Sequence, residues 1–312
     1  MLVTLKYILQ KAHKGGYAVG AFNVNNLEIL DAVIRATEKM RSPVIVQTSE
    51  GGVHYAGMGE VVALMRLKAK SAKAPVAVHL DHGKNVALVK KAIVSGYTSV
   101  MIDGSHLPFS KNVSVTKDIV RRAHARKISV EAELGAIAGI EDFVSVAERD
   151  AHLTNPEQAV DFVQKTNCDA LAIAVGTAHG AYKFKSAPRL DIERIRKIKK
   201  LTRLPLVLHG ASGISPELLS RMHKHCSVFG DCARLEGARG VSDRMIRAAI
   251  KTGINKINID SDLRIAFTAA VREKLLLDKK TFDPRTILGY ARDLMQKVVE
   301  EKMKLFGSAG KA

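Results

Sequence analysis

The chain has 312 residues, of which 46% are hydrophobic and 26% are charged, and this globular balance excludes disordered and fibrous proteins. No apolar run approaches the ~20 residues that a membrane-spanning helix needs. The formal net charge of +18 is spread along the chain, and its densest runs alternate with apolar residues at helical spacing, which predicts solvated outer faces of helices, with incidental polyanion binding as the alternative.

Short apolar runs typical of β-strands recur along the chain and alternate with amphipathic stretches. The strand-like runs span residues 18–22, 44–48, 76–80, 99–102, 129–133, 170–175, 206–208 and 256–259. Helical spacing of apolar residues follows some of them, as at Leu27, Leu30 and Ile34. Eight such units in a chain of this length are typical of a closed parallel barrel, although an open doubly wound sheet can produce similar runs.

Two helix starts and one long interval complete the predicted organisation. Asn155 and Ser215 each precede a proline, which predicts a side-chain cap followed by a first-turn proline. The interval 214–255 is longer than one crossover helix needs. We therefore predict an α/β fold: a single (β/α)₈ TIM barrel over residues 1–312, with an extended helical insertion between strands seven and eight.

The N-terminus and the cysteines indicate the cellular compartment in which the protein is expected. Residues 1–10 do not have the pattern of a signal peptide. Cys168, Cys226 and Cys232 are odd in number and are not arranged in Cys-x-x-Cys pairs, which favours reduced thiols. These features predict a cytoplasmic protein, in which Cys168 is a buried packing residue.

Polar residues lie at or just after the carboxyl ends of the predicted strands, where parallel barrels build their active sites. They are Asn23, Ser49, Asp81 with His82, Asp103, Glu133, His179, His209 with Gly210, and Asn258 with Asp260. Three histidines with an open fourth position are the usual composition of a catalytic zinc site; the alternative is that each is an ordinary core or surface group. Because neighbouring strand residues face opposite ways, Asp81 and His82 can both reach this site only if their strand ends by Leu80.

Glycine-rich loops follow several of the same strands. Residues 209–213 follow the seventh strand, residues 256–261 end the eighth, and residues 176–180 precede Lys183. Loops after the last two strands of such barrels frequently bind phosphate through glycine amides and small hydroxyls. The sequence therefore predicts a phosphate pocket beside the histidines.

At these residues the sequence resembles the class II, zinc-dependent fructose-bisphosphate aldolases, whose fold is a (β/α)₈ barrel. The matching stretches are 22–26, 79–83, 101–106, 130–135, 176–183, 208–213, 258–261 and 282–285. Three positions or segments depart from the family pattern: Ala138 replaces a glycine of a mobile loop, Ser261 replaces a threonine, and residues 214–255 are extended.

The resemblance implies a role for each matching residue. His82, His179 and His209 would hold the catalytic zinc, while Asp103 and Glu133 match positions that bind a second or alternative divalent ion; a monovalent cation is a further candidate. Asp81 matches the acid/base at the substrate C4 hydroxyl, and Glu141 matches an acid on the mobile loop. The implied contacts to the dihydroxyacetone phosphate half are Gly180, Lys183, Gly210, Ser212, Asn258, Asp260 and Ser261; Asn23 and Ser49 match other substrate contacts, and Arg264 matches a cation at the far phosphate.

The resemblance also implies an aldehyde-lyase that cleaves fructose 1,6-bisphosphate reversibly, in glycolysis or gluconeogenesis, as a homodimer or homotetramer with no membrane partner. Arg264 favours this substrate over its epimer, tagatose 1,6-bisphosphate. Zinc hydrolysis on the same barrel is another alternative, but Asn23 and Asn25 occupy the region where a His-x-His pair is expected. A catalytically inactive, basic nucleic-acid-binding barrel is a third.

Overall fold

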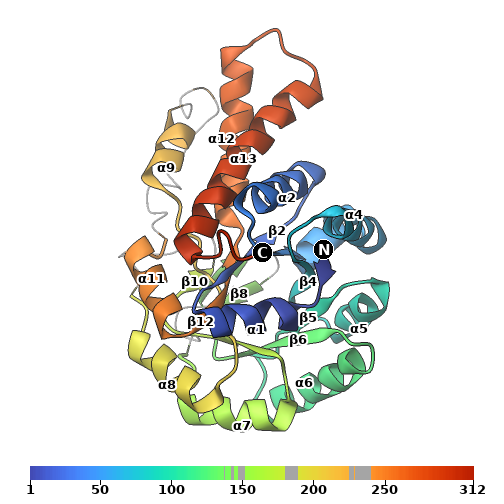
Figure 1. The fold of residues 1–312 in the computed structure, drawn as a ribbon, viewed down its shortest axis with the longest axis vertical. Coiled ribbons are helices and arrows are strands. Elements are labelled where there is room, and N and C mark those ends of the chain that lie inside the picture. The colour runs from blue at the N-terminus through green and yellow to red at the C-terminus, as the bar shows by residue number, and fades with distance from the viewer. Residues whose placement is uncertain (137, 142–143, 147–151, 180–188, 225–227, 229–239) are drawn as a thin grey trace.

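The structure is a computed structural model that describes residues 1–312 except 137, 142–143, 147–151, 180–188, 225–227 and 229–239. At 138–141, 144–146 and 178–179 it describes the backbone without the side chains. Figure 1 shows a barrel of strands surrounded by helices, with two helices extending away from it.

Eight of the described strands form a closed parallel barrel, which confirms the predicted fold class. They are β2 (Val19–Asn23), β3 (Val44–Thr48), β4 (Val76–Gly83), β5 (Ser99–Ile102), β6 (Ser129–Leu134), β9 (Ala170–Ile173), β11 (Leu206–Leu208) and β12 (Ile254–Ile259). Each pairs in parallel with its neighbours, β12 pairs with β2, and β4 pairs with β5, so the sheet has no open edge between these strands. Every predicted strand-like run overlaps one of them, although the runs 18–22 and 170–175 extend beyond β2 and β9.

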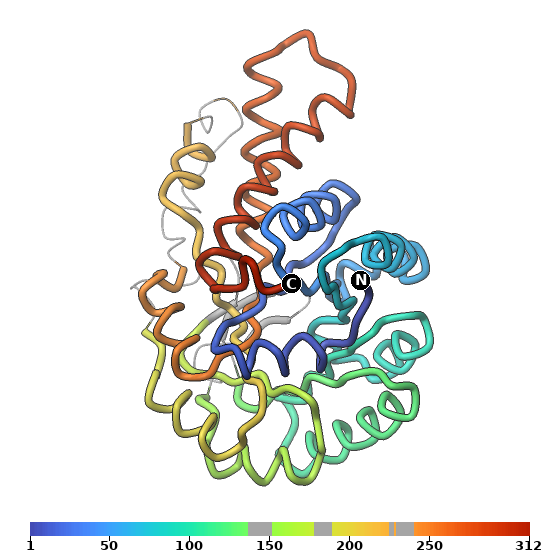
Figure 2. The backbone as a smooth tube through the Cα atoms, viewed as in Figure 1, coloured from blue at the N-terminus to red at the C-terminus, as the bar shows by residue number. Residues whose placement is uncertain are grey.

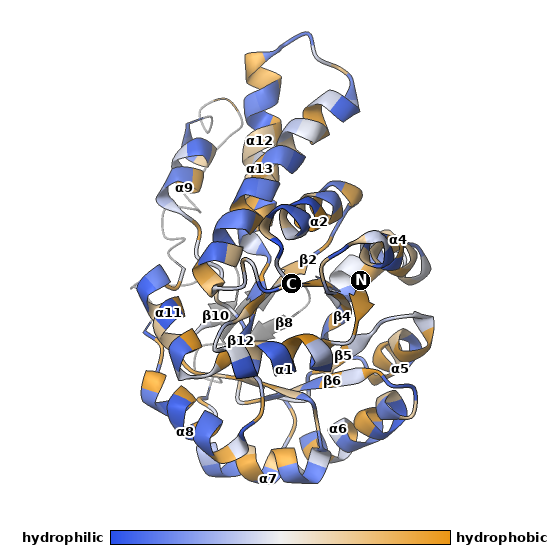
Figure 3. Ribbon diagram, viewed as in Figure 1, coloured by the Kyte–Doolittle hydropathy of each residue, from blue (hydrophilic) through white to orange (hydrophobic). Residues whose placement is uncertain are grey.

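Helices cover the outside of the barrel and turn their apolar faces toward it (Figure 3). They are α2 (Leu27–Met40), α3 (Glu50–Ala56), α4 (Met58–Ser71), α5 (Val86–Ser95), α6 (Phe109–His124), α7 (Pro156–Thr166), α8 (Ile192–Thr202), α11 (Asp243–Thr252) and α12 (Ser261–Leu277). The predicted cap at Asn155 is confirmed, because its side chain accepts a hydrogen bond from the Gln158 amide. None of the described helices has the length and apolarity needed to cross a bilayer.

The amino-terminal end of the barrel is closed by a segment that the sequence did not predict. Strand β1 (Leu2–Val3) pairs with β4, and Thr4 then caps α1 (Leu5–Gly15), which crosses the barrel in Figure 1. Leu5, Ile8, Leu9 and Ala12 form one apolar cluster with residues inside the barrel, among them Ala21, Ile45, Ala77, Met101 and Val207. This half of the barrel interior is therefore a packed hydrophobic core.

A second, small sheet lies outside the barrel. Strands β7 (Ala138–Glu141) and β8 (Val144–Val146) pair antiparallel, and β10 (Ala178–His179) adds to β7 in parallel. The resemblance implied a mobile loop where β7 and β8 lie. The described backbone of this segment pairs as β7 and β8, with Glu141 at the end of β7 opposite Val144; the mobility of the loop stays a prediction.

The last two helices form an arm that projects beyond the barrel (Figure 2). Helix α12 runs outward, and α13 (Pro284–Phe306) runs back and packs along α12 and α2. The Ala18 amide donates to the Phe306 carbonyl, which attaches the returning end to the barrel. Between β11 and β12 the structure describes α9 (Pro216–His223), capped by Ser215, and α11; the rest of the predicted insertion lies largely outside the described residues.

Candidate active site at the carboxyl end of the barrel

Asp81 and His82 both reach the barrel interior because of an irregularity in β4. The strand was predicted to end by Leu80, but it continues to Gly83. Its pairing with β5 shifts after Leu80, so that Asp81 and His82 together lie opposite Met101, and His82 has a left-handed φ of 45°. An extra residue of this kind is a β-bulge, which breaks the alternation of side chains. The bulge, rather than the end of the strand, turns both side chains toward the site.

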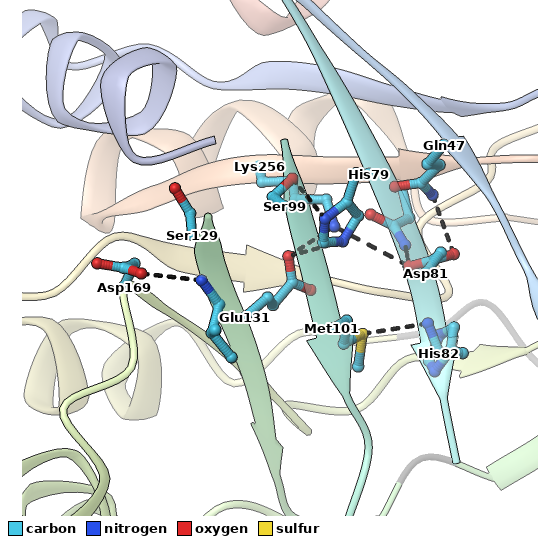
Figure 4. Close-up of polar contacts among 12 residues, drawn as sticks. Gln47, His79, Asp81, His82, Ser99, Met101, Ser129, Glu131, Asp169 and Lys256 are labelled. Carbon is cyan, nitrogen blue, oxygen red and sulfur yellow. Dashed lines mark hydrogen bonds and ion pairs between the residues drawn. The ribbon is translucent and has the colours of Figure 1, made fainter. Parts of the chain in front are cut away.

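Gly83 follows directly, and its backbone passes very close to the neighbouring strand. A Cβ added at this position would lie 2.5 Å from the Met101 carbonyl oxygen and would also collide with Val89. The His82 amide donates to the Met101 Sδ at 3.4 Å, as Figure 4 shows. The bulge is therefore fixed against β5 by close contacts that only a glycine at position 83 permits.

His82 and His209 come from opposite parts of the chain and meet at the carboxyl end of the barrel. Nε2 of His82 lies 2.5 Å from Nδ1 of His209, and the two rings are edge-on at 85°. Ligand atoms of Asp81, His82 and His209 all lie within 4.8 Å of one another. Burial, and next the charge of His82, lower the pKa of His209, which favours a neutral ring with a lone pair. Two imidazoles that direct ring nitrogens at one point are suited to share a cation.

Glu131, which was not predicted as a site residue, contacts the ring nitrogen of His209 that faces away from His82. Its Oε1 lies 2.9 Å from Nε2 of His209, and its Oε2 accepts a hydrogen bond from Lys256 Nζ at 2.6 Å. Although burial opposes ionisation, the Lys256 ammonium, followed by the hydrogen bond with His209, outweighs it and lowers the pKa of Glu131. An ionised Glu131 accepts the Nε2 proton of His209, which leaves Nδ1 as the ligand atom.

His79 completes this buried layer. Its Nδ1 lies 2.9 Å from the Ser99 hydroxyl, and its Nε2 lies 3.5 Å from Glu131 Oε2 (Figure 4). Burial, followed by the Lys256 charge, lowers the pKa of His79 well below its usual value. Lys256 therefore supplies the positive charge of this layer, and His79 stays neutral.

Asp103 and Glu133 face the other nitrogen of His82. Asp103 Oδ2 lies 3.5 Å and Glu133 Oε2 lies 3.7 Å from His82 Nδ1. Burial, then the charge of Asp103, raises the pKa of Glu133. For Asp103 the opposing effect of burial is the largest, but hydrogen bonds from His82 and Ser105 outweigh it and lower its pKa. The pKa values of these two neighbouring carboxyl groups are therefore shifted in opposite directions.

Asp81 is held by amide donors. Its Oδ1 accepts from Asn258 Nδ2 at 2.9 Å, and its Oδ2 accepts from Gln47 Nε2 at 3.0 Å. Gln47, which was not predicted, also donates to Asn23 Oδ1 at 2.7 Å. Asn23, Asp81 and Asn258 were predicted from three distant strands, and the structure brings all three into one hydrogen-bonded group.

Two of the predicted phosphate loops, residues 209–213 and 256–261, also meet at this end of the barrel. The Asp260 amide lies 3.5 Å from the Ser212 hydroxyl, which joins the loop after β11 to the start of α12 at Ser261. Gly210 has a left-handed φ of 61° in the same loop. Arg264 pairs with Asp260 through Nη2 at 2.6 Å and is 46% exposed at its side chain, so here its guanidinium lies against a carboxylate. Ser49 caps α3 by accepting from the Gly52 amide.

Four predicted residues are described only in part or not at all. The backbone of His179 lies in β10, paired with Gly139, and that of Glu141 ends β7, but their side chains are outside the described residues. Gly180 and Lys183 lie wholly outside them. Their roles therefore remain predictions.

Glu131 and Lys256 were not predicted as site residues, although the alternation of polar and apolar residues in the sequence indicates their position. In residues 129–134, Ser129, Glu131 and Glu133 alternate with Val130, Ala132 and Leu134, which pack in the outer core. Lys256 and Asn258 alternate with Ile257 and Ile259 in the same way. Period-two alternation assigns the polar set to the barrel interior, so charged residues in mid-strand could have been assigned to the site as well.

The donor set fits a divalent metal ion. It consists of the two imidazoles and the Asp81 carboxylate. On the other side of His82, Glu133 Oε2 is a buried oxygen with no hydrogen-bond donor among the described residues. Imidazole and carboxylate ligands suit zinc and several other first-row metals. A second group with all its ligand atoms within 4.8 Å consists of His82, Asp103 and Glu133, as expected for the second or alternative ion.

Comparisons with known proteins agree with this geometry. A family model described as fructose-bisphosphate aldolase class-II matches residues 3–311. The chain is 50% identical over 312 residues to a fructose-bisphosphate aldolase of Thermus caldophilus and 47% identical to one of Helicobacter pylori, and both alignments cover 100% of each chain. It also matches the crystal structure of the YdjI aldolase from Escherichia coli K12, with a TM-score of 0.79 and 32% identity over 100% of both chains.

Proposed function

Because the chain belongs to the class II fructose-bisphosphate aldolase family, we propose that it catalyses the reversible cleavage of fructose 1,6-bisphosphate to dihydroxyacetone phosphate and glyceraldehyde 3-phosphate. The observation that carries the proposal is the convergence of His82, His209 and Asp81 at the carboxyl end of the barrel. The family is metal-dependent, and this group unites two metal-ligand side chains with a carboxylate that can move a proton.

His82 and His209 would hold the catalytic ion through the nitrogens that face each other, with His179 as the third ligand. We propose zinc as this ion. When bound, it supplies a Lewis acid that polarises the substrate carbonyl and stabilises the negative charge of the three-carbon product. Asp103 and Glu133 support the second nitrogen of His82 and offer ligands to a second divalent ion, with a monovalent cation as a further candidate.

Asp81 takes the proton of the C4 hydroxyl in the cleavage direction. As that O–H bond breaks, the C4 carbonyl forms, the C3–C4 bond breaks, and its electron pair stays on C3. The amides of Gln47 and Asn258 hold the Asp81 carboxylate in one orientation, which is what a positioned general base requires. Glu141 then supplies a proton to C3 of the three-carbon fragment.

The remaining predicted residues bind the two ends of the substrate. Their binding energy holds the reacting carbons in place beside Asp81. The proposed contacts to the dihydroxyacetone phosphate half are Gly180, Lys183, Gly210, Ser212, Asn258, Asp260 and Ser261, with Asn23 and Ser49 as further contacts. Arg264, which here pairs with Asp260, would turn to the far phosphate.

A coupled assay tests the proposal. Cleavage of fructose 1,6-bisphosphate should be lost on chelation and recover when zinc is added back. Initial rates on tagatose 1,6-bisphosphate should be lower, because it differs at the C4 hydroxyl that Asp81 contacts. A metal-loaded protein that cleaves neither epimer would refute the function.

The proposal extends to the organisation of the protein. Residues 1–312 would form one catalytic domain, acting as a cytoplasmic homodimer or homotetramer in glycolysis or gluconeogenesis. Analytical ultracentrifugation of the active protein checks the oligomeric part, and a purely monomeric active species would exclude it.

A further inference from the structure

Lys302 joins three segments that are far apart in the sequence. It lies on α13, and its side chain is only 11% exposed. Its Nζ donates a hydrogen bond to the Gly213 carbonyl oxygen at 2.9 Å and lies 2.8 Å from Asp262 Oδ1. A lysine so deeply buried, with an anchored head group, has a defined structural task.

The two partners of Lys302 belong to the two sides of the proposed phosphate pocket. Gly213 ends the glycine-rich loop that follows β11, and Asp262 lies in the first turn of α12, next to Ser261. The contact between the Asp260 amide and the Ser212 hydroxyl joins these sides directly. Lys302 on α13 also joins the two sides, through its contacts with Gly213 and Asp262.

The charge at the start of α12 makes this contact significant. A helix N-terminus attracts anions, but carboxylates at its first residues repel a phosphate group. In this structure Asp260 pairs with Arg264, whose side chain is 46% exposed. Asp262 is 1% exposed at its side chain, and Lys302 is the cation that pairs with it among the described residues. Without Lys302, Asp262 would place an uncompensated buried charge beside the phosphate.

Packing leaves the loop little freedom to adjust. A Cβ at Gly213 would lie 2.8 Å from the Val241 carbonyl oxygen, and a Cβ at Gly240 would collide with the Ser212 carbonyl oxygen. Residues 212–213 are therefore in backbone contact with residues 240–241 on one side and are hydrogen-bonded to Lys302 on another. Hydrogen bonding of the Gly213 carbonyl fixes the peptide plane at the end of the loop.

We propose that Lys302 is a positioning residue for phosphate recognition: it fixes the glycine-rich loop and cancels the Asp262 charge, so that a phosphate monoester can bind at the start of α12. The proposal rests on the proposed function, because that function places the substrate phosphate in this pocket. It adds a residue from the C-terminal helix that does not touch the substrate.

The test uses four variants of the zinc-loaded enzyme: Lys302→Met, Asp262→Asn, the double variant, and Lys297→Met. The last is the matched control, because it removes an exposed lysine from the same helix. Inorganic phosphate is the probe, measured both by calorimetric titration and as a competitive inhibitor of cleavage. KM and kcat are determined separately.

Lys302→Met should weaken phosphate binding and raise KM on the order of tenfold, the effect of one uncompensated charge near a dianion, with a smaller change in kcat. Asp262→Asn should not weaken phosphate binding, and the double variant should recover most of the loss. Lys297→Met should behave as the wild type.

Two results would overturn the proposal. One is a folded Lys302→Met variant with unchanged phosphate affinity, as expected if the phosphate bound only to the metal. The other is an Asp262→Asn variant whose phosphate affinity falls on the order of tenfold below that of the wild type, which would indicate a purely structural ion pair; this arm is compared with the wild type and decides the matter even if Lys302→Met does not fold. If the wild type binds phosphate but cleaves no sugar bisphosphate, the proposed function fails while the calorimetric test of Lys302 stands.

Discussion

The two halves of the barrel interior are built from the same strands but have opposite chemistry. Ala21 on β2, Ile45 on β3, Ala77 on β4 and Val207 on β11 pack under α1 in an apolar cluster. Two residues further along each strand, the same face carries Asn23, Gln47, His79 and His209, all buried and all polar. Because side chains alternate with period two, one step of two residues changes the interior from a hydrophobic core to a site of chemistry.

The two halves are stabilised by different interactions. The apolar half is stabilised by burial, which depends on contact and volume and has no directional requirement. The polar half needs a partner for every buried group. Several of these groups find partners in a connected set in which Glu131 contacts His209, Lys256 and His79, whereas Glu133 Oε2 has no hydrogen-bond partner among the described residues. Changes in the two halves should therefore have separable effects.

The largest effect is expected from Asp81→Ala, which removes the proposed base. Turnover should fall roughly 100- to 10,000-fold, the usual contribution of a positioned acid or base. The measurement is kcat at saturating substrate in a variant whose metal content has been determined. Unchanged turnover in the metal-loaded variant would remove Asp81 from this role.

Leu9→Ala should act only on the apolar half. Leu9 is fully buried in the cluster beneath the site, so its truncation should lower the free energy of unfolding by about 2–5 kcal/mol through lost burial and a cavity. Metal affinity and kcat should remain those of the wild type. Urea unfolding measures the free energy of unfolding, and competition with a chelator measures metal affinity. The control is Leu67→Ala, at a 65% exposed position. Loss of metal affinity in Leu9→Ala would show that the apolar and polar halves of the interior are not separable.

Glu131→Gln should act on the polar half without touching the substrate. A glutamine cannot accept hydrogen bonds from both His209 and Lys256, because one of its two ends is a donor. Metal affinity should fall roughly 10- to 100-fold, as is typical when a carboxylate that orients a histidine ligand is lost. Competition with a chelator of known affinity measures this, with Glu157→Gln on the exposed face of α7 as the control. Wild-type affinity in a folded variant would contradict the assigned role of Glu131.

The smallest effect is expected at the exposed basic residues of the outer helices. Lys197 pairs with Glu157 across α8 and α7, and both side chains are more than half exposed. Exposed ion pairs of this kind often contribute nothing measurable, so Lys197→Ala should leave the melting temperature and kcat/KM unchanged. A clear loss in kcat/KM, measured at low and high salt, would show that the basic surface takes part in function.

Much of the fold and part of the site were predictable because local patterns encode them. The strand positions and the caps at Asn155 and Ser215 depend on neighbours within a few residues, and the structure confirms them. The apolar plug α1 was missed because its burial depends on interior residues contributed by distant strands. Glu131 and Lys256 lie in the middle of β6 and β12, so a prediction based on polar residues at strand ends does not include them.

The local pattern of the chain predicts which strands form and which residue types can bind metal or phosphate, because period-two alternation and capping depend on near neighbours. How these residues act together follows from contacts between distant segments. The bulge at His82 depends on pairing with β5, the ring orientation of His209 depends on Glu131, and the pairing of Asp262 depends on Lys302 from the last helix. These contacts join residues that are 19 to 78 positions apart in the sequence. They form only when the closed sheet and its helices bring those residues together.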